Sequence, residues 1–345
     1  MSQSQNDVSV KLNGISFNLD KFRIDLKNPD PDIHNSFLSF GRMNFGFSDI
    51  EMSLDEFDNS RRSTFAFKGP NFTLDNLDFN IAFDSPNPWQ TLIKEFNLSQ
   101  NNPNAIAQNI SRNEMNFHLG GIELLFASQG SFDMNNNNKL VEFQLDKAFF
   151  RVSNAKVDLM HNNMLSSKLT VKIMDYHINL DNIFFELNNS NDVPRVEKFS
   201  GEIALKNLEI QIPDEIYMQS GFKQLSTLFG MRTNIFRLRQ IAMEVRFVDS
   251  NYCQLDATVY SPFATITMNG NFSIRQHRHH EPEVYINNLS FSVPYLSRGL
   301  NDLVTQWENK NNQHIPRKAG AIFIELSGEP DNLQVKGLDI KRLKF

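Results

Sequence analysis

Apolar and polar residues alternate along most of this chain. Between residues 8 and 26 the apolar side chains stand two positions apart, except at residues 12–15 and 19–22, where they stand three apart. A period of two is typical of a strand that has one apolar and one polar face. This segment therefore predicts either a strand pair or one long bent strand.

The same alternation continues to the end of the chain and predicts a mostly β fold. The runs at 65–67 and 72–74 flank a turn at Gly69-Pro70. Strict alternation, as opposed to solid apolar runs, favours antiparallel strands with one dry and one wet face. The other runs that predict strands are 117–126, 140–152, 169–173, 178–187, 203–212, 241–248, 255–260, 265–274, 284–293, 321–326 and 333–343.

A six-residue motif recurs within these runs: apolar, any residue, Asn, apolar, any residue, apolar. Its copies at 74–79, 205–210 and 286–291 are each followed by a proline and an amphipathic segment, which indicates internal repeats. Five further copies have Asn or Gly in third place and no helix after them, namely 12–17, 119–124, 152–157, 180–185 and 335–340.

The spacing within the motif has a physical consequence. Apolar residues at its first, fourth and sixth positions change faces once, and one extra residue restores the alternation. A β-bulge or tight bend does this, and Asn and Gly tolerate the positive φ that such a site requires. We therefore predict bent or twisted strands, with chance recurrence in an Asn-rich and apolar-rich chain as the alternative.

Three amphipathic helices are predicted, after Pro88, Pro213 and Pro294. Gly230 is the expected end of the second helix. The three helices either pack on the core of the sheet or act as surface or gate helices. Their apolar stripes are Trp89, Leu92, Ile93 and Phe96; Ile216, Phe222, Leu225, Leu228 and Phe229; and Leu296, Leu300, Leu303, Val304 and Trp307.

The chain has 345 residues and no long linker rich in Gly, Ser or Pro. This favours one elongated, repeat-like β body over residues 1–345, with possible sub-units at 1–135, 136–275 and 276–345. The fold class that we expect is mostly β: an elongated, bent antiparallel sheet with three helices packed on it.

Composition bears on what the apolar face does. The chain contains 31 Phe but only 6 Tyr and 2 Trp, and Phe suits a dry interior or contact with acyl chains. Only 40% of the residues are hydrophobic, and the mean hydropathy is −0.41. The apolar residues are therefore concentrated on one face, which must pack against another layer or line a groove that a hydrophobic ligand fills.

Other chemistry finds little support in the sequence. A net charge of −6 without a strong basic patch argues against a nucleic acid partner, and Arg237, Arg239 and Arg246 are spaced as outward residues of strands. No phosphate-binding, hydrolase or metalloprotease motif is present, so we expect neither an enzyme nor a cofactor. The lone Cys253 is expected to be a buried, inert thiol.

One cluster of histidines is a candidate metal-binding site, and it consists of His277, His279 and His280. Because His279 and His280 are adjacent, their rings point apart on an extended chain. We interpret the cluster as a solvated hairpin tip, with metal binding as the alternative.

The repeated motif, together with the stretch IELSGEPDNLQVKGLDI at residues 324–340, resembles the AsmA-like envelope proteins of Gram-negative bacteria. That resemblance implies a curved β-groove with an apolar lining, anchored in the inner membrane, facing the periplasm and associated with holding or moving lipids. It brings no catalytic residues. The present chain departs from the family pattern because a polar tail of residues 1–7 leads directly into the first strand and no apolar run approaches the ~18 residues of a spanning helix. Either an anchor has been removed, and with it the means of membrane association, or the protein is cytoplasmic.

The leading hypothesis is a non-enzymatic envelope protein that binds or transfers lipid, or another long apolar ligand, along a Phe-rich groove, with other envelope proteins as possible partners. The alternative is a structural or protein-interaction module with a closed β core and no ligand. The residues expected to line the groove are Phe79, Ile81, Phe83, Phe185, Leu208, Ile210, Phe291 and Val293, and the expected helical covers are Phe96, Phe229 and Trp307.

Overall fold

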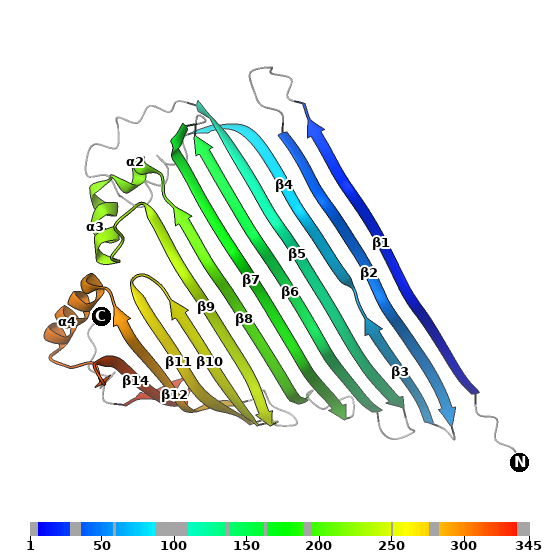
Figure 1. Cartoon of the computed structure of the whole chain (residues 1–345). Coiled ribbons are helices and arrows are strands. Elements are labelled where there is room, and N and C mark those ends of the chain that lie inside the picture. The colour runs from blue at the N-terminus through cyan, green and yellow to red at the C-terminus, as the bar shows by residue number, and fades with distance from the viewer. Residues whose placement is uncertain are drawn as a thin grey trace, which may run out of the picture.

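The computed structural model describes residues 6–27, 36–57, 60–86, 110–134, 139–161, 164–188, 195–249, 251–275 and 283–336. These residues form one large antiparallel sheet with short helices at one end (Figure 1). The predicted fold class is confirmed: the chain is mostly β, and every strand pair in the described sheet is antiparallel.

The sheet contains fifteen described strands. The first eight strands are β1 (Asn6–Leu26), β2 (Ser36–Phe57), β3 (Ser60–Lys68), β4 (Asn71–Pro86), β5 (Ile110–Met134), β6 (Lys139–His161), β7 (Met164–Asn188) and β8 (Arg195–Gln211). The others are β9 (Ile235–Asp249), β10 (Tyr252–Tyr260), β11 (Ala264–Arg275), β12 (Glu283–Leu296), β13 (Arg317–Lys318), β14 (Ala321–Glu329) and β15 (Asn332–Val335).

Strand order follows the sequence almost throughout. Each strand pairs with the next from β5 to β12, and β14 then pairs with β12, β13 and β15. The strands β3 and β4 share one place in the sheet, because both lie between β2 and β5. At ~3.3 Å per residue, the 23 residues of β6 span roughly 75 Å. The sheet is thus long in the strand direction and wide across it.

Most of the predicted strands are confirmed, and several are longer than expected. Residues 8–26 lie in the single strand β1, and the runs at 169–173 and 178–187 both belong to β7. The strand β2 was not predicted, although its residues follow the same alternation. The run at 333–343 is described only as far as residue 336, and β15 ends at Val335.

The six-residue motif produces local left-handed backbone. Positive φ angles of 51° to 54° occur at Asn76, Asn154, Asn182 and Asn207, and Gly14 has a φ of 67°. The bend predicted at these five copies is therefore confirmed. At Gly121 no positive φ occurs, and at Asn288 the β11–β12 register shifts instead. The third residue of the copy at 335–340 lies outside the described residues.

Three of these bends, at Asn76, Asn154 and Asn207, line up across the sheet in what we call the central crease. Asn76 lies between the pairs Asp75–Gly121 and Leu77–Leu119, so one residue on each strand is skipped and the register does not shift. A bulge confined to one strand would have shifted the register. Here the skipped residues of neighbouring strands lie opposite each other. Each strand therefore switches between odd and even apolar positions at the same level, and the apolar side chains stay on one face. The central crease comprises Lys21, Gly41, Asn76, Gly120, Asn154, Met174, Asn207 and Arg239.

The described helices are α2 (Asp214–Tyr217), α3 (Ser220–Leu228) and α4 (Arg298–Asn311). The helix predicted after Pro213 is confirmed, though in two pieces, and Gly230 with a φ of 69° follows its end. The start after Pro294 was placed too early, because β12 runs through this proline to Leu296 and α4 begins only after Ser297. The helix predicted after Pro88 lies outside the described residues.

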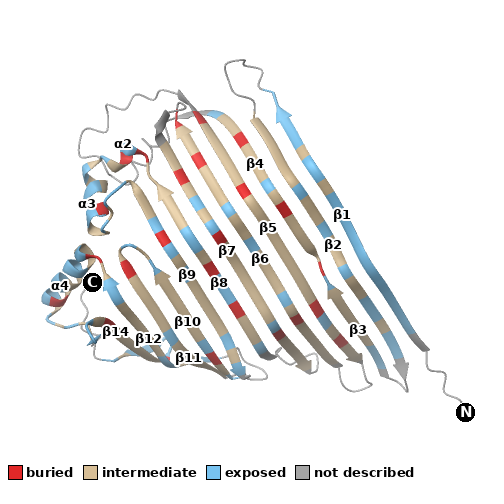
Figure 2. Cartoon of the chain, in the orientation of Figure 1, coloured by how far each residue is buried: buried red, intermediate tan, exposed pale blue. Residues whose placement is uncertain are grey.

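The helices pack at one end of the sheet. Ile216 of α2 is buried against Leu159, Leu169, Ile212 and Phe222. Over the rest of the sheet, fully buried residues are scattered and most residues are half-buried (Figure 2). The described residues thus form a single layer with two accessible faces.

Candidate functional site: the apolar face of the sheet

One face of the sheet is apolar from edge to edge. Residues that pair directly on neighbouring strands point to the same face, so the register shows which side chains lie together. The longest such row crosses twelve strands without a polar residue, and we call it the long row. It comprises Phe17, Phe45, Phe72, Leu124, Phe150, Ile178, Ile203, Met243, Ala257, Met268, Phe291 and Ile324.

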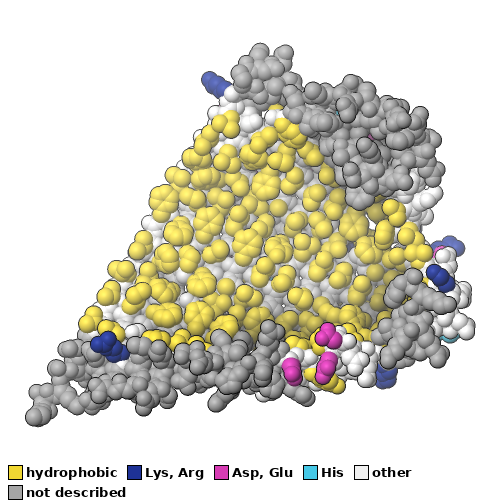
Figure 3. Space-filling view, turned by 180° about the vertical axis from the view of Figure 1, so that it is seen from behind, with side chains coloured by type: hydrophobic (Ala, Val, Ile, Leu, Met, Phe, Trp, Pro, Cys, Tyr) yellow, Lys and Arg dark blue, Asp and Glu magenta, His cyan; other side chains and the backbone are white. Residues whose placement is uncertain are grey.

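This face is accessible. No member of the long row is buried, and Phe17, Phe45 and Ile203 are exposed by 53%, 43% and 37%. Apolar side chains fill the face over the width of the sheet, and its middle lies open to view (Figure 3). Monomeric soluble proteins rarely expose continuous apolar patches of more than a few hundred Å², and larger patches mark binding surfaces.

The structure brings the eight predicted groove residues onto this one face. Phe79 and Ile210 lie in a single row with Phe117, Val157 and Val171 between them. Ile81 and Phe83 follow Phe79 on β4, Leu208 precedes Ile210 on β8, Phe185 pairs with Phe143, and Val293 follows Phe291 on β12.

The predicted helical covers are placed differently. Phe229 follows α3, and its ring lies 5.4 Å from that of Phe263, which lies 5.8 Å from the ring of Phe236 on the apolar face. Phe229 therefore reaches only the end of the face. Trp307 lines a shallow hollow of about 690 Å³ on α4 with Leu300, Leu303 and Ile315. Phe96 lies outside the described residues.

The sequence interpretation missed the contribution of β2 to this face. Leu38, Phe40, Met43, Phe45 and Phe47 stand at spacings of two and three, as the residues of β1 do, and they pair with the apolar residues of β1. The signal was present in the sequence: the spacing of three between Phe40 and Met43 marks the central crease.

The opposite face is polar, and its buried carboxylates are paired. Asp158 accepts from Lys156 at 2.6 Å, from Lys168 at 2.8 Å and from Thr170 Oγ1 at 2.7 Å. Burial opposes ionisation of Asp158, but these three donors outweigh it and hold the pKa of the carboxyl below its ordinary value. The charged form of Asp158 is thus stabilised on this face.

Asp175 on β7 shows the same balance. Burial disfavours its charged form, whereas Arg151, with Nε at 2.6 Å, and His177 favour it, and its pKa lies below the ordinary value. Paired charges of this kind suit a surface that faces water.

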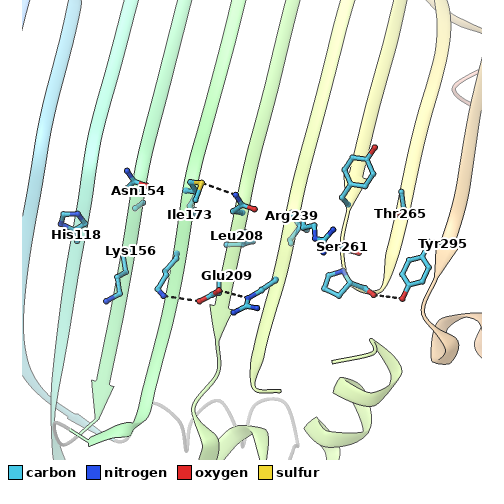
Figure 4. A pocket seen from close by; sticks show the side chains of 18 residues that line it. His118, Asn154, Lys156, Ile173, Leu208, Glu209, Arg239, Ser261, Thr265 and Tyr295 are labelled. Carbon is cyan, nitrogen blue, oxygen red and sulfur yellow. Dashed lines mark hydrogen bonds and ion pairs between the residues drawn. The ribbon is translucent and has the colours of Figure 1, made fainter. Parts of the chain in front are cut away.

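A groove of about 1040 Å³ lies on the polar face along the central crease (Figure 4). At its centre, Glu209 accepts from Arg237 Nε at 2.9 Å and from Lys172 Nζ at 3.3 Å. The hydrogen bond from Arg237, against a smaller effect of burial, lowers the pKa of Glu209. Across the groove, Tyr295 donates to the Pro262 carbonyl at 3.2 Å.

Other candidate chemistry is not assembled in the described parts of the chain. Within them, no group of three or more His, Cys, Asp or Glu side chains is arranged to hold a metal ion. The cluster of His277, His279 and His280 lies outside the described residues. Cys253 is fully buried on β10, as expected. None of the described helices has the length and apolar character needed to cross a membrane.

Comparison with protein-family models, with curated proteins and with solved structures gave no match to this chain.

Proposed function

We propose that this protein is a non-enzymatic lipid-binding protein that holds or transfers lipid, or another long apolar ligand, on the apolar face of its sheet. The observation that carries the proposal is the long row, in which twelve strands each contribute an apolar side chain and none is buried. An apolar surface of this extent gains free energy when it leaves water, at about 25 cal/mol per Å².

The form of the face favours a long ligand. Eleven strand spacings of ~4.8 Å give the long row a length of roughly 50 Å, more than one extended acyl chain requires. A continuous strip without polar side chains offers no fixed hydrogen-bonding partner for a headgroup. Such a strip therefore selects a ligand by the length of its apolar chain and not by its headgroup. Because the same strip extends past any one acyl chain, it is also compatible with movement of lipid along it.

The alternative, a module with a closed β core, is less well supported. Such a module needs a second layer over the apolar face, and among the described residues α2 and the end of α3 pack only at one end of it. The resemblance to AsmA-like proteins agrees with lipid binding, and we include in the proposal an envelope location on the periplasmic side, with other envelope proteins as partners.

The test measures bound lipid directly. Protein purified without detergent is analysed for co-purified lipid by mass spectrometry and titrated with a fluorescent fatty acid. The test variant, Ile203→Lys with Met268→Lys, puts two charges into the long row. We expect it to lose co-purified lipid and to bind the fluorescent fatty acid at least tenfold more weakly, because a buried ammonium is costly.

The matched control is Glu202→Lys with Asn269→Lys, which places lysines at the adjacent positions of the same strands on the polar face. We expect this variant to bind as the parent does, and circular dichroism establishes that both variants retain the sheet. Absence of co-purified lipid and of saturable probe binding in the parent protein would reject the proposed function. Equal loss of binding in both double variants would reject the apolar face as the site.

A further inference from the structure

The strand β1 is an unusual edge. Among the described elements it pairs only with β2, and no described strand lies beyond it (Figure 1). It has 21 residues, and nearly all of its described residues are exposed, including Val8 at 59% and Val10 at 55%. An edge strand of this length presents a row of unpaired backbone donors and acceptors to another strand.

The apolar positions of β1 are symmetric about Phe17. Its apolar face carries residues 8, 10, 12, 15, 17, 19, 22, 24 and 26, and reversing the strand about residue 17 reproduces that set. Two antiparallel copies of β1 centred on Phe17 would therefore place apolar opposite apolar throughout. The pairs would be Val8–Leu26, Val10–Ile24, Leu12–Phe22, Ile15–Leu19 and Phe17–Phe17.

The same reversal exchanges the two gaps in the apolar pattern, residues 12–15 and 19–22, and each gap holds one left-handed residue. The left-handed residues of β1 are Gly14, with a φ of 67°, and Lys21, with a φ of 55°. The reversal sets Gly14 opposite Asp20 and Lys21 opposite Asn13, so each left-handed residue would face one with negative φ. Within the sheet, Asn76 likewise faces Gly120, which has no positive φ, although there only β4 carries a left-handed residue. The bent segments of the two copies would therefore lie side by side.

We propose that two copies of this chain associate through antiparallel pairing of their β1 strands, with a two-fold axis at Phe17. An interface of this symmetry requires a surface that is complementary to itself, which the pattern of β1 provides and an arbitrary edge strand does not. Each copy contributes residues 8–26 of β1 to the pairing, which is close to the lower end of the roughly 20–30 residues per side of a standard interface.

The pairing has a direct consequence for the apolar face. Because the axis stands perpendicular to the sheet, the apolar faces of both copies lie on the same side. The long row ends at Phe17, and in the dimer it would continue from Phe17 of one copy into Phe17 of the other. On the polar side, Lys11 would lie opposite Arg23, and each already has an acidic partner, Glu51 and Asp25 respectively.

The test combines solution mass with cross-linking. Sedimentation of the full chain is expected to give twice the chain mass, with dissociation on dilution. The variant Phe17→Cys is expected to form a disulfide-linked dimer under mild oxidation, because facing Cα atoms in antiparallel strands are ~4.5–5.5 Å apart, within the range of a disulfide. Cys253 has no exposed surface and does not compete.

The register is tested with two exposed polar-face positions. In the proposed register Ser9 of one copy lies opposite Asp25 of the other, and the two copies of Ser9 are roughly 50 Å apart. Ser9→Cys alone is expected not to cross-link, whereas a mixture of Ser9→Cys and Asp25→Cys chains is expected to do so. The variant Ser16→Lys with Asn18→Lys sets like charges opposite each other and is expected to weaken the dimer at least tenfold.

A single-chain mass at all concentrations would overturn the proposal. So would a dimer that Ser9→Cys cross-links as readily as Phe17→Cys, or one whose affinity is unchanged by Ser16→Lys with Asn18→Lys. None of these measurements requires lipid, so their failure is distinct from failure of the proposed function.

Discussion

Asparagine in the central crease is selected by backbone conformation. Asn154 has a φ of 51°, and its side chain is exposed. The left-handed region costs an ordinary L-residue roughly 1–2 kcal/mol and is worse for a β-branched one, whereas Asn and Gly enter it readily. The motif was recognisable in the sequence for this reason: few residue types can occupy its third position.

We expect Asn154→Val to lower the free energy of unfolding by about 1–2 kcal/mol, because valine must adopt the left-handed conformation. Asn154→Gly is expected to change it by less than about 0.5 kcal/mol, since glycine adopts that conformation without strain. Urea unfolding followed by circular dichroism measures both. Equal costs for valine and glycine would show that the asparagine side chain, and not its conformation, is what the crease requires.

A second residue-scale prediction concerns Asp158. Its folded-state pKa is lowered because the donors Lys156, Lys168 and Thr170 outweigh burial. The stabilisation is therefore fully present above the carboxyl's ordinary pKa, near 3.9, and is lost as the pH falls through the lower folded-state value. We expect Asp158→Asn to cost about 1–3 kcal/mol at pH 7.

Urea unfolding of the parent and of Asp158→Asn at several pH values measures this difference. The difference is expected to shrink below pH 4, because the parent carboxyl is then protonated. Asp256→Asn, at a more exposed position, is the control. A difference that stayed constant down to pH 2 would contradict the assignment of the lowered pKa to Asp158.

At the scale of elements, α3 and α4 meet at a close contact. A Cβ atom on Gly299 would lie 2.6 Å from the backbone oxygen of Leu228, and Ser297 Oγ donates to that same oxygen at 3.0 Å. At its other end α4 is held by Glu308, which accepts from Arg317 Nη1 and from the Ile315 backbone N–H, both at 2.7 Å. The helix is therefore fixed at both ends.

We expect Gly299→Ala to separate α3 from α4, because backbone atoms cannot move aside as a flexible side chain can. Overpacking of this kind costs about 1–3 kcal/mol. Hydrogen exchange should show faster exchange in residues 298–311, with little change in β5–β8. Asp302→Ala, an exposed change on the same helix, serves as the control. Unchanged exchange in α4 would mean that the contact is not maintained in solution.

Features that depend on residues close together in the sequence could be predicted, whereas features that depend on pairing between distant segments could not. Alternation and the six-residue motif are local, and they indicated the strands, the bends and the common face of residues as distant as Phe79 and Phe291. The predicted helix start near Pro294 was wrong because this proline lies within a strand. The neighbouring sequence alone does not show whether a proline ends a strand or lies inside it. The alignment of the bends into the central crease depends on register, and register is a property of paired strands and not of one segment.

For the whole molecule, the described structure is one sheet whose apolar side is open over its middle. The abundance of Phe in a chain of low mean hydropathy predicts that one-sided arrangement. These properties do not determine whether a second layer or a ligand covers the apolar side, because coverage depends on where the chain turns back on itself.

This openness predicts an unusual response to the dye ANS, which in most proteins binds partly folded states. Here the native protein should bind it, and fluorescence should fall as urea unfolds the sheet, because the apolar face is a property of the folded state. A fatty acid should displace the dye. The variant Ile203→Lys with Met268→Lys should show weaker native fluorescence than Glu202→Lys with Asn269→Lys. Dye binding that appeared only during unfolding would mean that the face is covered in the native protein, and the closed-core alternative would then be the better account.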